Sequence, residues 1–198
     1  MKVLVWADVH FNLWQRANTD PFGKVAEEIA SVDALIVAGE IAESPAQGWP
    51  GFFGYLEGLI DLGRVWVIPG NHDYYGRRLD DDSGLAGIAA QAGVNFAQKR
   101  RFEIGGNRFL CCTLWMDFAL TDDVPEAMMS ARLTLPDYGR ITFGPEHRPL
   151  KPADLLDVHL DHLAWLEGSV PAVGVGGRAR SPGVAQRAAG RDAGGHRR

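Results

Sequence analysis

Short apolar runs alternate with amphipathic segments over the first 70 residues of the chain. The runs at residues 2–7, 34–38 and 65–68 are too short for helices and rich in β-branched and aromatic residues, so we expect fully buried strands. The segments 22–30 and 46–62 between them carry apolar residues at helical spacing. This strand–helix–strand–helix–strand order predicts a parallel sheet with right-handed crossovers, in which ligands bind beyond the carboxyl ends of the strands.

The second predicted helix is bounded by proline and glycine. Pro50 is expected in its first turn and Gly63 at its C-cap, just before the third strand. The later pattern predicts a helix at 83–92, strands at 94–97, 101–104 and 108–114, a hairpin turn at Gly105-Gly106-Asn107, and a helix at 152–167. With 198 residues and 46% hydrophobic content, we expect one α/β domain over residues 1–168.

The composition of the sequence changes after Gly168. Glycine, alanine and arginine dominate residues 169–198, and valine is the largest apolar side chain among them. A segment of this composition cannot bury a core, so we expect it to be disordered. We interpret the abrupt change as a shifted reading frame in a GC-rich gene, with a natural basic tail as the alternative.

Charge divides the chain at the same place. The net charge is −5, and residues 169–198 hold six arginines against one aspartate, which leaves −10 on the first 168 residues. An acidic body argues against a nucleic-acid partner. It fits a protein that concentrates carboxylates to hold cations.

Neither the cysteines nor the N-terminus point to secretion. Cys111 and Cys112 are adjacent in an apolar run, are not expected to bridge, and indicate a reducing compartment. The apolar start meets Asp8 too early for a signal peptide, and no run approaches the ~20 residues that cross a bilayer. We therefore expect a cytoplasmic protein with no membrane partner. Nothing in the pattern indicates an oligomeric state.

Side chains that bind metals follow the first two predicted strands. Asp8 and His10 lie two residues apart, so they point the same way on an extended chain, and a carboxylate with an imidazole suits Zn, Mn or Fe. Glu40 follows the second strand, where a carboxylate can bridge two cations. Each has a plain alternative: a capping aspartate beside a surface histidine, or a glutamate favoured by a helix dipole.

The third strand is followed by Gly70-Asn71-His72-Asp73. Gly70 allows a sharp turn of the backbone, and Asn71 offers a carbonyl oxygen to a second metal. His72 would project beside the metals toward a substrate's leaving group. Asp73 is expected to orient His72 or its loop. The alternative for this segment is a tight turn made of ordinary turn formers.

Together and in this order, the three segments resemble the calcineurin-like metallophosphoesterase family. That family is known for Asp-x-His, then Gly-Asp near a second strand end, then Gly-Asn-His followed by Asp or Glu. The resemblance extends over roughly residues 1–167. The segments 113–118, 137–138 and 159–166 also resemble a bacterial subgroup of small predicted phosphoesterases. The fold implied is a four-layer α/β/β/α sandwich of two mixed sheets.

The resemblance implies a phosphoric ester hydrolase with a dinuclear metal site. Asp8 and His10 would bind the first metal, Glu40 would bridge, and Asn71 would bind the second. A metal-bound hydroxide would attack phosphorus, and His72 would be the catalytic residue that stabilises the developing charge or protonates the leaving oxygen. The cofactors implied are two divalent ions, Mn, Fe or Zn, and the substrate is a small-molecule or nucleotide phosphate ester.

Two departures from the family pattern matter. The bridging position usually holds Asp, and the extra methylene of Glu40 shifts its carboxylate, where ~1 Å can cost ~100-fold in rate. The family also supplies histidines from a later strand end and a Gly-His-x-His segment, and neither follows Gly168. We therefore expect an incomplete second sheet. The alternative function is an impaired or inactive remnant that keeps the fold and binds metal weakly, with at most one ion.

Four further residues are candidates for a substrate pocket: Trp14, Trp115, Asp117 and Phe118. Core packing is the alternative for Trp115 and Phe118, and we favour it for Phe118. His159 and His162 lie on a predicted helix, and we interpret them as surface or packing residues.

Overall fold

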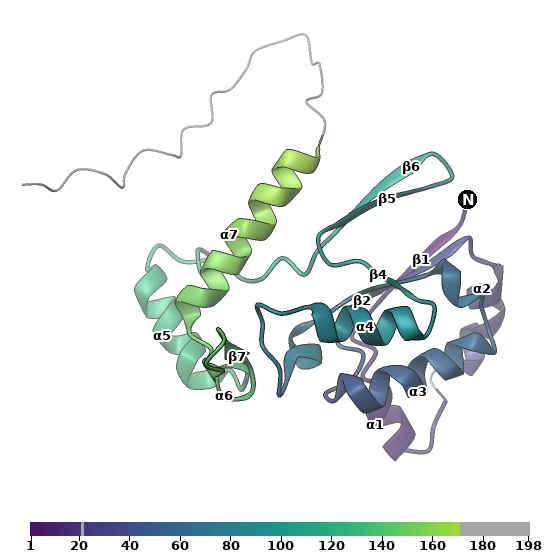
Figure 1. Cartoon of the computed structure of the whole chain (residues 1–198), viewed down its shortest axis with the longest axis horizontal. Coiled ribbons are helices and arrows are strands. Elements are labelled where there is room, and N and C mark those ends of the chain that lie inside the picture. The colour runs from purple at the N-terminus through teal and green to yellow at the C-terminus, as the bar shows by residue number, and fades with distance from the viewer. Residues whose placement is uncertain (21, 171–198) are drawn as a thin grey trace, which may run out of the picture.

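A four-stranded parallel sheet forms the centre of the molecule (Figure 1). The computed structural model describes residues 1–20 and 22–170, so most of the predicted disordered tail lies outside the described residues. The strands are β1 (Val3–Ala7), β2 (Ala34–Ala38), β3 (Val65–Ile68) and β4 (Asn95–Phe96), and they lie in the order β1-β2-β3-β4. This confirms the predicted α/β fold and brings the carboxyl ends of β1, β2 and β3 to one edge.

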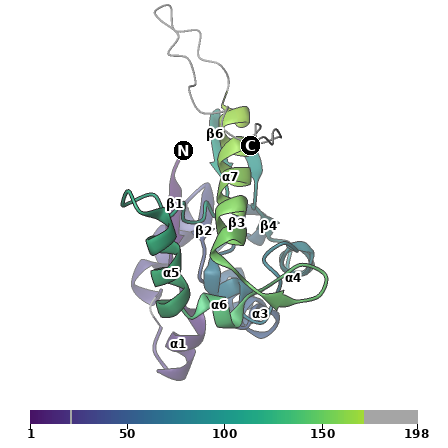
Figure 2. The same cartoon turned by 90° about the vertical axis from the view of Figure 1, so that its left-hand side faces the viewer.

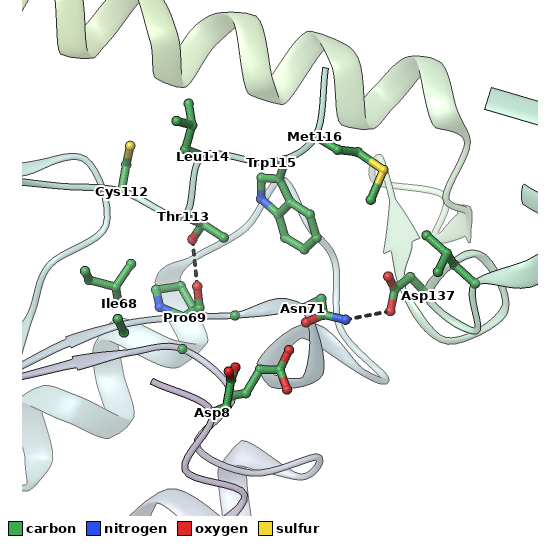
Figure 3. Close-up of a pocket in the computed structure, with 15 residues that line it drawn as sticks. Asp8, Ile68, Pro69, Asn71, Cys112, Thr113, Leu114, Trp115, Met116 and Asp137 are labelled. Atoms are coloured by element: carbon green, nitrogen blue, oxygen red, sulfur yellow. Dashed lines mark hydrogen bonds between the residues drawn. The ribbon is translucent and has the colours of Figure 1, made fainter. Parts of the chain in front are cut away.

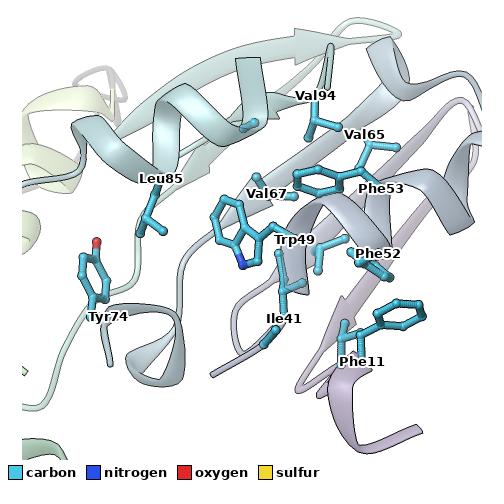
Figure 4. Packing of buried hydrophobic residues seen from close by; sticks show 14 of the residues in the cluster. Phe11, Ile41, Trp49, Phe52, Phe53, Val65, Val67, Tyr74, Leu85 and Val94 are labelled. Carbon is cyan, nitrogen blue, oxygen red and sulfur yellow. The ribbon is translucent and has the colours of Figure 1, made fainter. Parts of the chain in front are cut away.

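The main core lies between one face of this sheet and the helices that connect its strands. The helices are α1 (Phe11–Arg16), α2 (Ala26–Ser31), α3 (Pro45–Glu57) and α4 (Ser83–Gln91). Figure 4 shows Trp49, Phe52 and Phe53 of α3 packed toward Val65 and Val67 of β3. All five side chains are at most 1% exposed. Burial of such aromatic side chains is the largest favourable term that holds helices to a sheet.

The bounds of the helices differ from the predicted ones in several places. Helix α3 begins at Pro45, so Pro50 lies inside it and not in its first turn, and it ends at Glu57. Gly63 is therefore not its C-cap but part of the 3-10 helix η2 (Leu62–Arg64). The predicted helix at 22–30 is the 3-10 helix η1 (Gly23–Val25) followed by α2.

A β-hairpin covers part of the opposite face of the sheet. Strands β5 (Arg100–Ile104) and β6 (Asn107–Cys111) are antiparallel, and Gly105 and Gly106 form their turn with φ of 54° and 79°. Phe102 of β5 stacks on Trp66 of β3 with ring centroids 3.6 Å apart. In the described residues this second layer has only two strands, as the expected incomplete sheet requires. Each described sheet is purely parallel or purely antiparallel, not mixed as expected.

Strand β1 is less buried than its apolar sequence predicted. It is an edge strand, and its Val5 is 61% exposed. The neighbouring Ile36 and Ile68 on the same face are buried with Phe102 of the hairpin. The prediction of a fully buried strand was therefore wrong, because the hairpin covers β2 and β3 but not the outer half of β1.

The remaining elements lie beside the carboxyl edge of the sheet (Figure 2). They are the 3-10 helix η3 (Asn71–Tyr74), α5 (Val124–Thr134), α6 (Asp137–Arg140), β7 (Thr142–Phe143), β8 (Arg148–Pro149) and α7 (Pro152–Ser169). Helix α7 packs against α5, and α6 packs against η3. The sequence pattern predicted α7 but neither α5 nor α6. Among residues 1–20 and 22–170, no helix combines the length and apolarity needed to cross a membrane.

An ion pair fixes the start of α7 and makes stability depend on pH. Both carboxylate oxygens of Asp154 accept hydrogen bonds from Arg148, at 2.6 and 2.7 Å. These bonds hold the pKa of Asp154 below its usual value, so their stabilisation is present above about pH 4 and lost as pH falls through the lowered pKa. We expect Asp154→Asn to reduce the free energy of unfolding by about 1–2 kcal/mol at pH 7.

Urea denaturation at several pH values checks this expectation. The difference between wild type and Asp154→Asn should shrink below about pH 4, where Asp154 becomes protonated in both the folded and the unfolded protein. A difference that is constant from pH 7 to pH 3 would contradict the assigned role of the charge.

Candidate metal centre

The loops that follow β1 and β2 are joined by backbone hydrogen bonds. The N–H of His10 donates to the carbonyl of Glu40 at 2.7 Å, and that of Phe11 donates to Ile41 at 2.9 Å. These bonds bring the first two predicted motifs side by side at the sheet edge. The side-chain positions of His10 and Glu40 are thus set by the same pair of loops.

Three of the predicted metal ligands have left-handed backbone conformations. The φ angles of Asp8, His10 and Glu40 are 53°, 44° and 52°. Such conformations cost of order 1–3 kcal/mol each in residues other than glycine, and they persist where surrounding structure enforces them. Here the hydrogen bonds between the loops supply that constraint. Strain concentrated at predicted ligands is an observation that favours a functional site.

Close approach of the second and third loops explains Gly70. A Cβ at this position would lie 2.6 Å from the backbone nitrogen of Glu40 and 2.9 Å from its Cγ. The backbone of Gly70 is extended, with φ −102° and ψ −176°. The expected sharp turn at Gly70 was therefore wrong, and the residue is glycine because a side chain would displace Glu40.

Asp73 ties the third loop to the second. Its side chain is fully buried and accepts hydrogen bonds from the backbone N–H groups of Gly70 at 2.9 Å, Ile41 at 3.1 Å and Ala42 at 3.2 Å. The indole nitrogen of Trp49 donates to it at 2.8 Å. Burial raises the pKa of Asp73, and the hydrogen bonds from these four donors oppose that shift. The geometry agrees with the expected role of Asp73 in orienting its loop.

The three loops bring His10, Glu40 and His72 together. Each offers one ligand atom, and these atoms lie within 4.8 Å of one another. Nε2 of His10 is 2.8 Å from a carboxylate oxygen of Glu40, and the rings of His10 and His72 are 5.1 Å apart. Two imidazoles and a carboxylate are a donor set that suits Zn, Mn or Fe. The residues present therefore fit a divalent metal ion.

The other two predicted ligands lie at the adjacent cavity, which has a volume of about 420 Å³ (Figure 3). Asp8 and Asn71 line it together with Glu40. Asp8 does not belong to the group formed by His10, Glu40 and His72. The predicted set is thus gathered at one edge, but His72, expected to act on substrate, lies as close to the ligand point as His10 does.

Irregular chain after β6 forms the opposite wall of the cavity. Trp115 lines it and is 7% exposed, so this side chain belongs both to the cavity wall and to the core. Phe118 is buried in the core, as we favoured. Asp117 is exposed and accepts a hydrogen bond from the backbone of Ala119, and it is not among the residues that line this cavity. Trp14 lines a separate cavity beside α1.

The cysteines and the late histidines show no sign of metal binding in the described residues. Cys111 and Cys112 are free thiols, and burial raises the pKa of Cys111 to about 11. His162 is buried, which lowers its pKa, and Nδ1 of His159 contacts the carbonyl of Trp115. Both histidines of α7 therefore pack against the body, in agreement with their interpretation as packing residues.

Residues that the sequence pattern did not single out complete the surroundings of His72. Tyr75 stacks on its ring with centroids 4.5 Å apart, and a carboxylate oxygen of Glu43 lies 3.8 Å from its Nδ1. Asp137 accepts hydrogen bonds from Tyr75 at 2.8 Å and from Asn71 at 3.0 Å. The only signal for these residues was proximity in sequence for Tyr75 and Glu43; Asp137 is more than 60 residues away from both partners.

A parallel sheet with imidazole, carboxylate and amide groups at its carboxyl edge is the arrangement of a metal-dependent phosphoesterase. A family model described as calcineurin-like phosphoesterase matches residues 1–169, and the chain belongs to this family. Among solved structures, the chain is similar to the phosphopantetheinyl hydrolase of Mycobacterium tuberculosis, with a TM-score of 0.54 and 18% sequence identity. No curated protein matches the chain.

The structural match is a statement about the fold. It covers 83% of this chain but 62% of the hydrolase, so the chain spans less than two thirds of that structure. At 18% identity, the likeness supports the shared arrangement of strands and helices. The substrate named for that hydrolase remains a property of that protein.

Proposed function

We propose that this chain hydrolyses a phosphate ester with two divalent metal ions held at the carboxyl edge of the parallel sheet. The observation that carries the proposal is the convergence of His10, Glu40 and His72 to within 4.8 Å, with Asp8 and Asn71 lining the adjacent cavity. The expected cofactors are Mn, Fe or Zn. The expected substrate is a small-molecule or nucleotide phosphate ester, because the cavity beside these groups has a volume of about 420 Å³.

Each polar side chain has a proposed role. Asp8 and His10 would hold one ion, Asn71 would hold the other, and the Glu40 carboxylate would contact both. Divalent cations bound there supply charge neutralisation of the phosphoryl oxygens and lower the pKa of the attacking water. His72 would stabilise the developing negative charge or donate a proton to the leaving oxygen. Stacking on Tyr75 would keep its ring in place for this step.

A specific observation favours the alternative, an impaired remnant with one weakly held ion. Glu40 already contacts His10 at 2.8 Å, so the carboxylate is partly engaged within the chain. In residues 1–20 and 22–170, the group that meets ligand distances has three members, all from the first 72 residues. A chain that binds one ion with low affinity and has no turnover would follow from this arrangement.

Hydrolysis of an aryl phosphate with added Mn²⁺ distinguishes the two proposals. The full chain is assayed before chelation, after chelation and after Mn²⁺ is restored, with His72→Ala prepared in the same way. We expect turnover that disappears on chelation, returns with Mn²⁺ and exceeds that of His72→Ala. A wild-type rate no higher than that of His72→Ala contradicts the enzyme proposal and favours the remnant.

A further inference from the structure

Helix α6 places a buried carboxylate behind the predicted metal ligands. Asp137, its first residue, is 4% exposed, and α6 packs against η3, which carries Asn71 and His72. The two elements are more than 60 residues apart in sequence. A buried carboxylate is costly unless its oxygens accept hydrogen bonds, so its partners show what it is there to hold.

One partner of Asp137 is the side-chain amide of Asn71. Nδ2 of Asn71 donates to Oδ1 of Asp137 at 3.0 Å. An ionised carboxylate only accepts hydrogen bonds, so it selects the orientation in which the amide nitrogen faces Asp137. The amide oxygen of Asn71 then faces the cavity where Asp8 and Glu40 lie, as Figure 3 shows. This is the oxygen that a second cation would need.

The other partner is Tyr75, which supports the ring of His72. The hydroxyl of Tyr75 donates to the same Oδ1 at 2.8 Å, and its ring stacks on His72 at an interplanar angle of 28°. The guanidinium of Arg140, also on α6, lies 4.9 Å from the centroid of the Tyr75 ring. Tyr75 is thus fixed at its hydroxyl by one end of α6 and at its ring by the other.

We propose that Asp137 is a positioning residue that sets the amide orientation of Asn71 and, through Tyr75, the ring of His72. This inference rests on the proposed function, because it assigns to Asp137 the orientation of a metal ligand and of the residue that acts on substrate. Groups behind metal ligands commonly change metal affinity by about 10- to 100-fold when they are replaced.

Titration of the full chain with Mn²⁺, followed by calorimetry, tests the assignment to Asn71. We expect Asp137→Asn to weaken the lower-affinity Mn²⁺ site about tenfold, because the amide of Asn71 is no longer held in one orientation. In a chain that already carries Asn71→Ala, the same substitution should cause no further loss, since Asp137 acts through Asn71. Asp154→Asn is the matched control: Asp154 is also a buried carboxylate with hydrogen bonds, but it pairs with Arg148.

The outcomes separate this inference from the proposed function. Mn²⁺ affinity that Asp137→Asn leaves unchanged, or lowers no more than Asp154→Asn does, overturns the role of Asp137 alone. A wild-type chain that binds no Mn²⁺ overturns the proposed function and this inference with it.

Tyr75→Phe tests the second arm and keeps the buried carboxylate in place. It removes the hydroxyl that reaches Asp137 but preserves the aromatic ring. We expect the Mn²⁺ affinity to stay at the wild-type value while kcat for the aryl phosphate falls and KM does not. Unchanged kcat, or a loss of Mn²⁺ binding, contradicts the assignment of Tyr75 to His72.

Discussion

Replacement of Asp73 by alanine is expected to lower the free energy of unfolding by about 3 kcal/mol or more. The substitution leaves the buried N–H groups of Gly70, Ile41 and Ala42 and the indole of Trp49 without their acceptor. Each buried donor without a partner costs about 1–3 kcal/mol, less where water enters the space. Against a typical total of about 5–15 kcal/mol, this is a large fraction of the stability of a domain.

Urea denaturation of the wild type and of Asp73→Ala measures the effect. Asp61→Asn is a suitable control, because Asp61 is an exposed aspartate that also accepts a backbone hydrogen bond, from Gly63. The control should change stability by less than about 0.5 kcal/mol, as surface substitutions usually do. If Asp73→Ala is no more destabilising than the control, the carboxylate does not hold the two loops together.

Glu40→Gln is expected to reduce the affinity for Mn²⁺ by at least about 100-fold. Replacement of groups behind metal ligands already costs up to about 100-fold, and Glu40 supplies the one carboxylate in the group with His10 and His72. A neutral amide has nearly the same shape, so the loss would report on the charge and the donor atom. The rest of the loop should be retained, because its backbone is held by His10 and Asp73.

Glu43→Gln provides the matched control for this variant. Glu43 lies three residues further along the same loop, and its carboxylate is 3.8 Å from His72 and 3.9 Å from Arg140. It does not belong to the group of three, so its affinity for Mn²⁺ should stay near that of the wild type. Equal losses in the two variants would indicate a general effect of negative charge and would contradict a ligand role for Glu40.

The parallel core of the fold could be predicted from the sequence because its signals are local. Apolar runs of strand length, helical spacing between them and the order of the elements were sufficient to place β1, β2 and β3 and their shared edge. The burial of Val5 could not be predicted, because it depends on how far the hairpin β5–β6 extends over the sheet. Helix α5 escaped prediction since its apolar residues do not form one buried stripe: Met129 and Leu133 are 59% and 77% exposed.

The candidate site could be predicted as far as its residues follow strands. Asp8, His10, Glu40, Asn71 and His72 each stand directly after one, and the sheet brings them to one edge. Asp137 and its contact with Asn71 were not predictable, because no periodic pattern links residues more than 60 positions apart on separate irregular segments. The same limit applied to Asp73, whose partners Ile41 and Trp49 lie on other elements.

The central claim is that metal held at this edge is used to hydrolyse phosphate esters. The most direct test is to titrate the metal-free full chain with Mn²⁺ and to measure bound metal and aryl phosphate turnover on the same samples. We predict that turnover rises with bound Mn²⁺, saturates with it, and is lost together with it in Glu40→Gln. Turnover that persists without bound metal, or bound metal at saturation without turnover, would contradict this account.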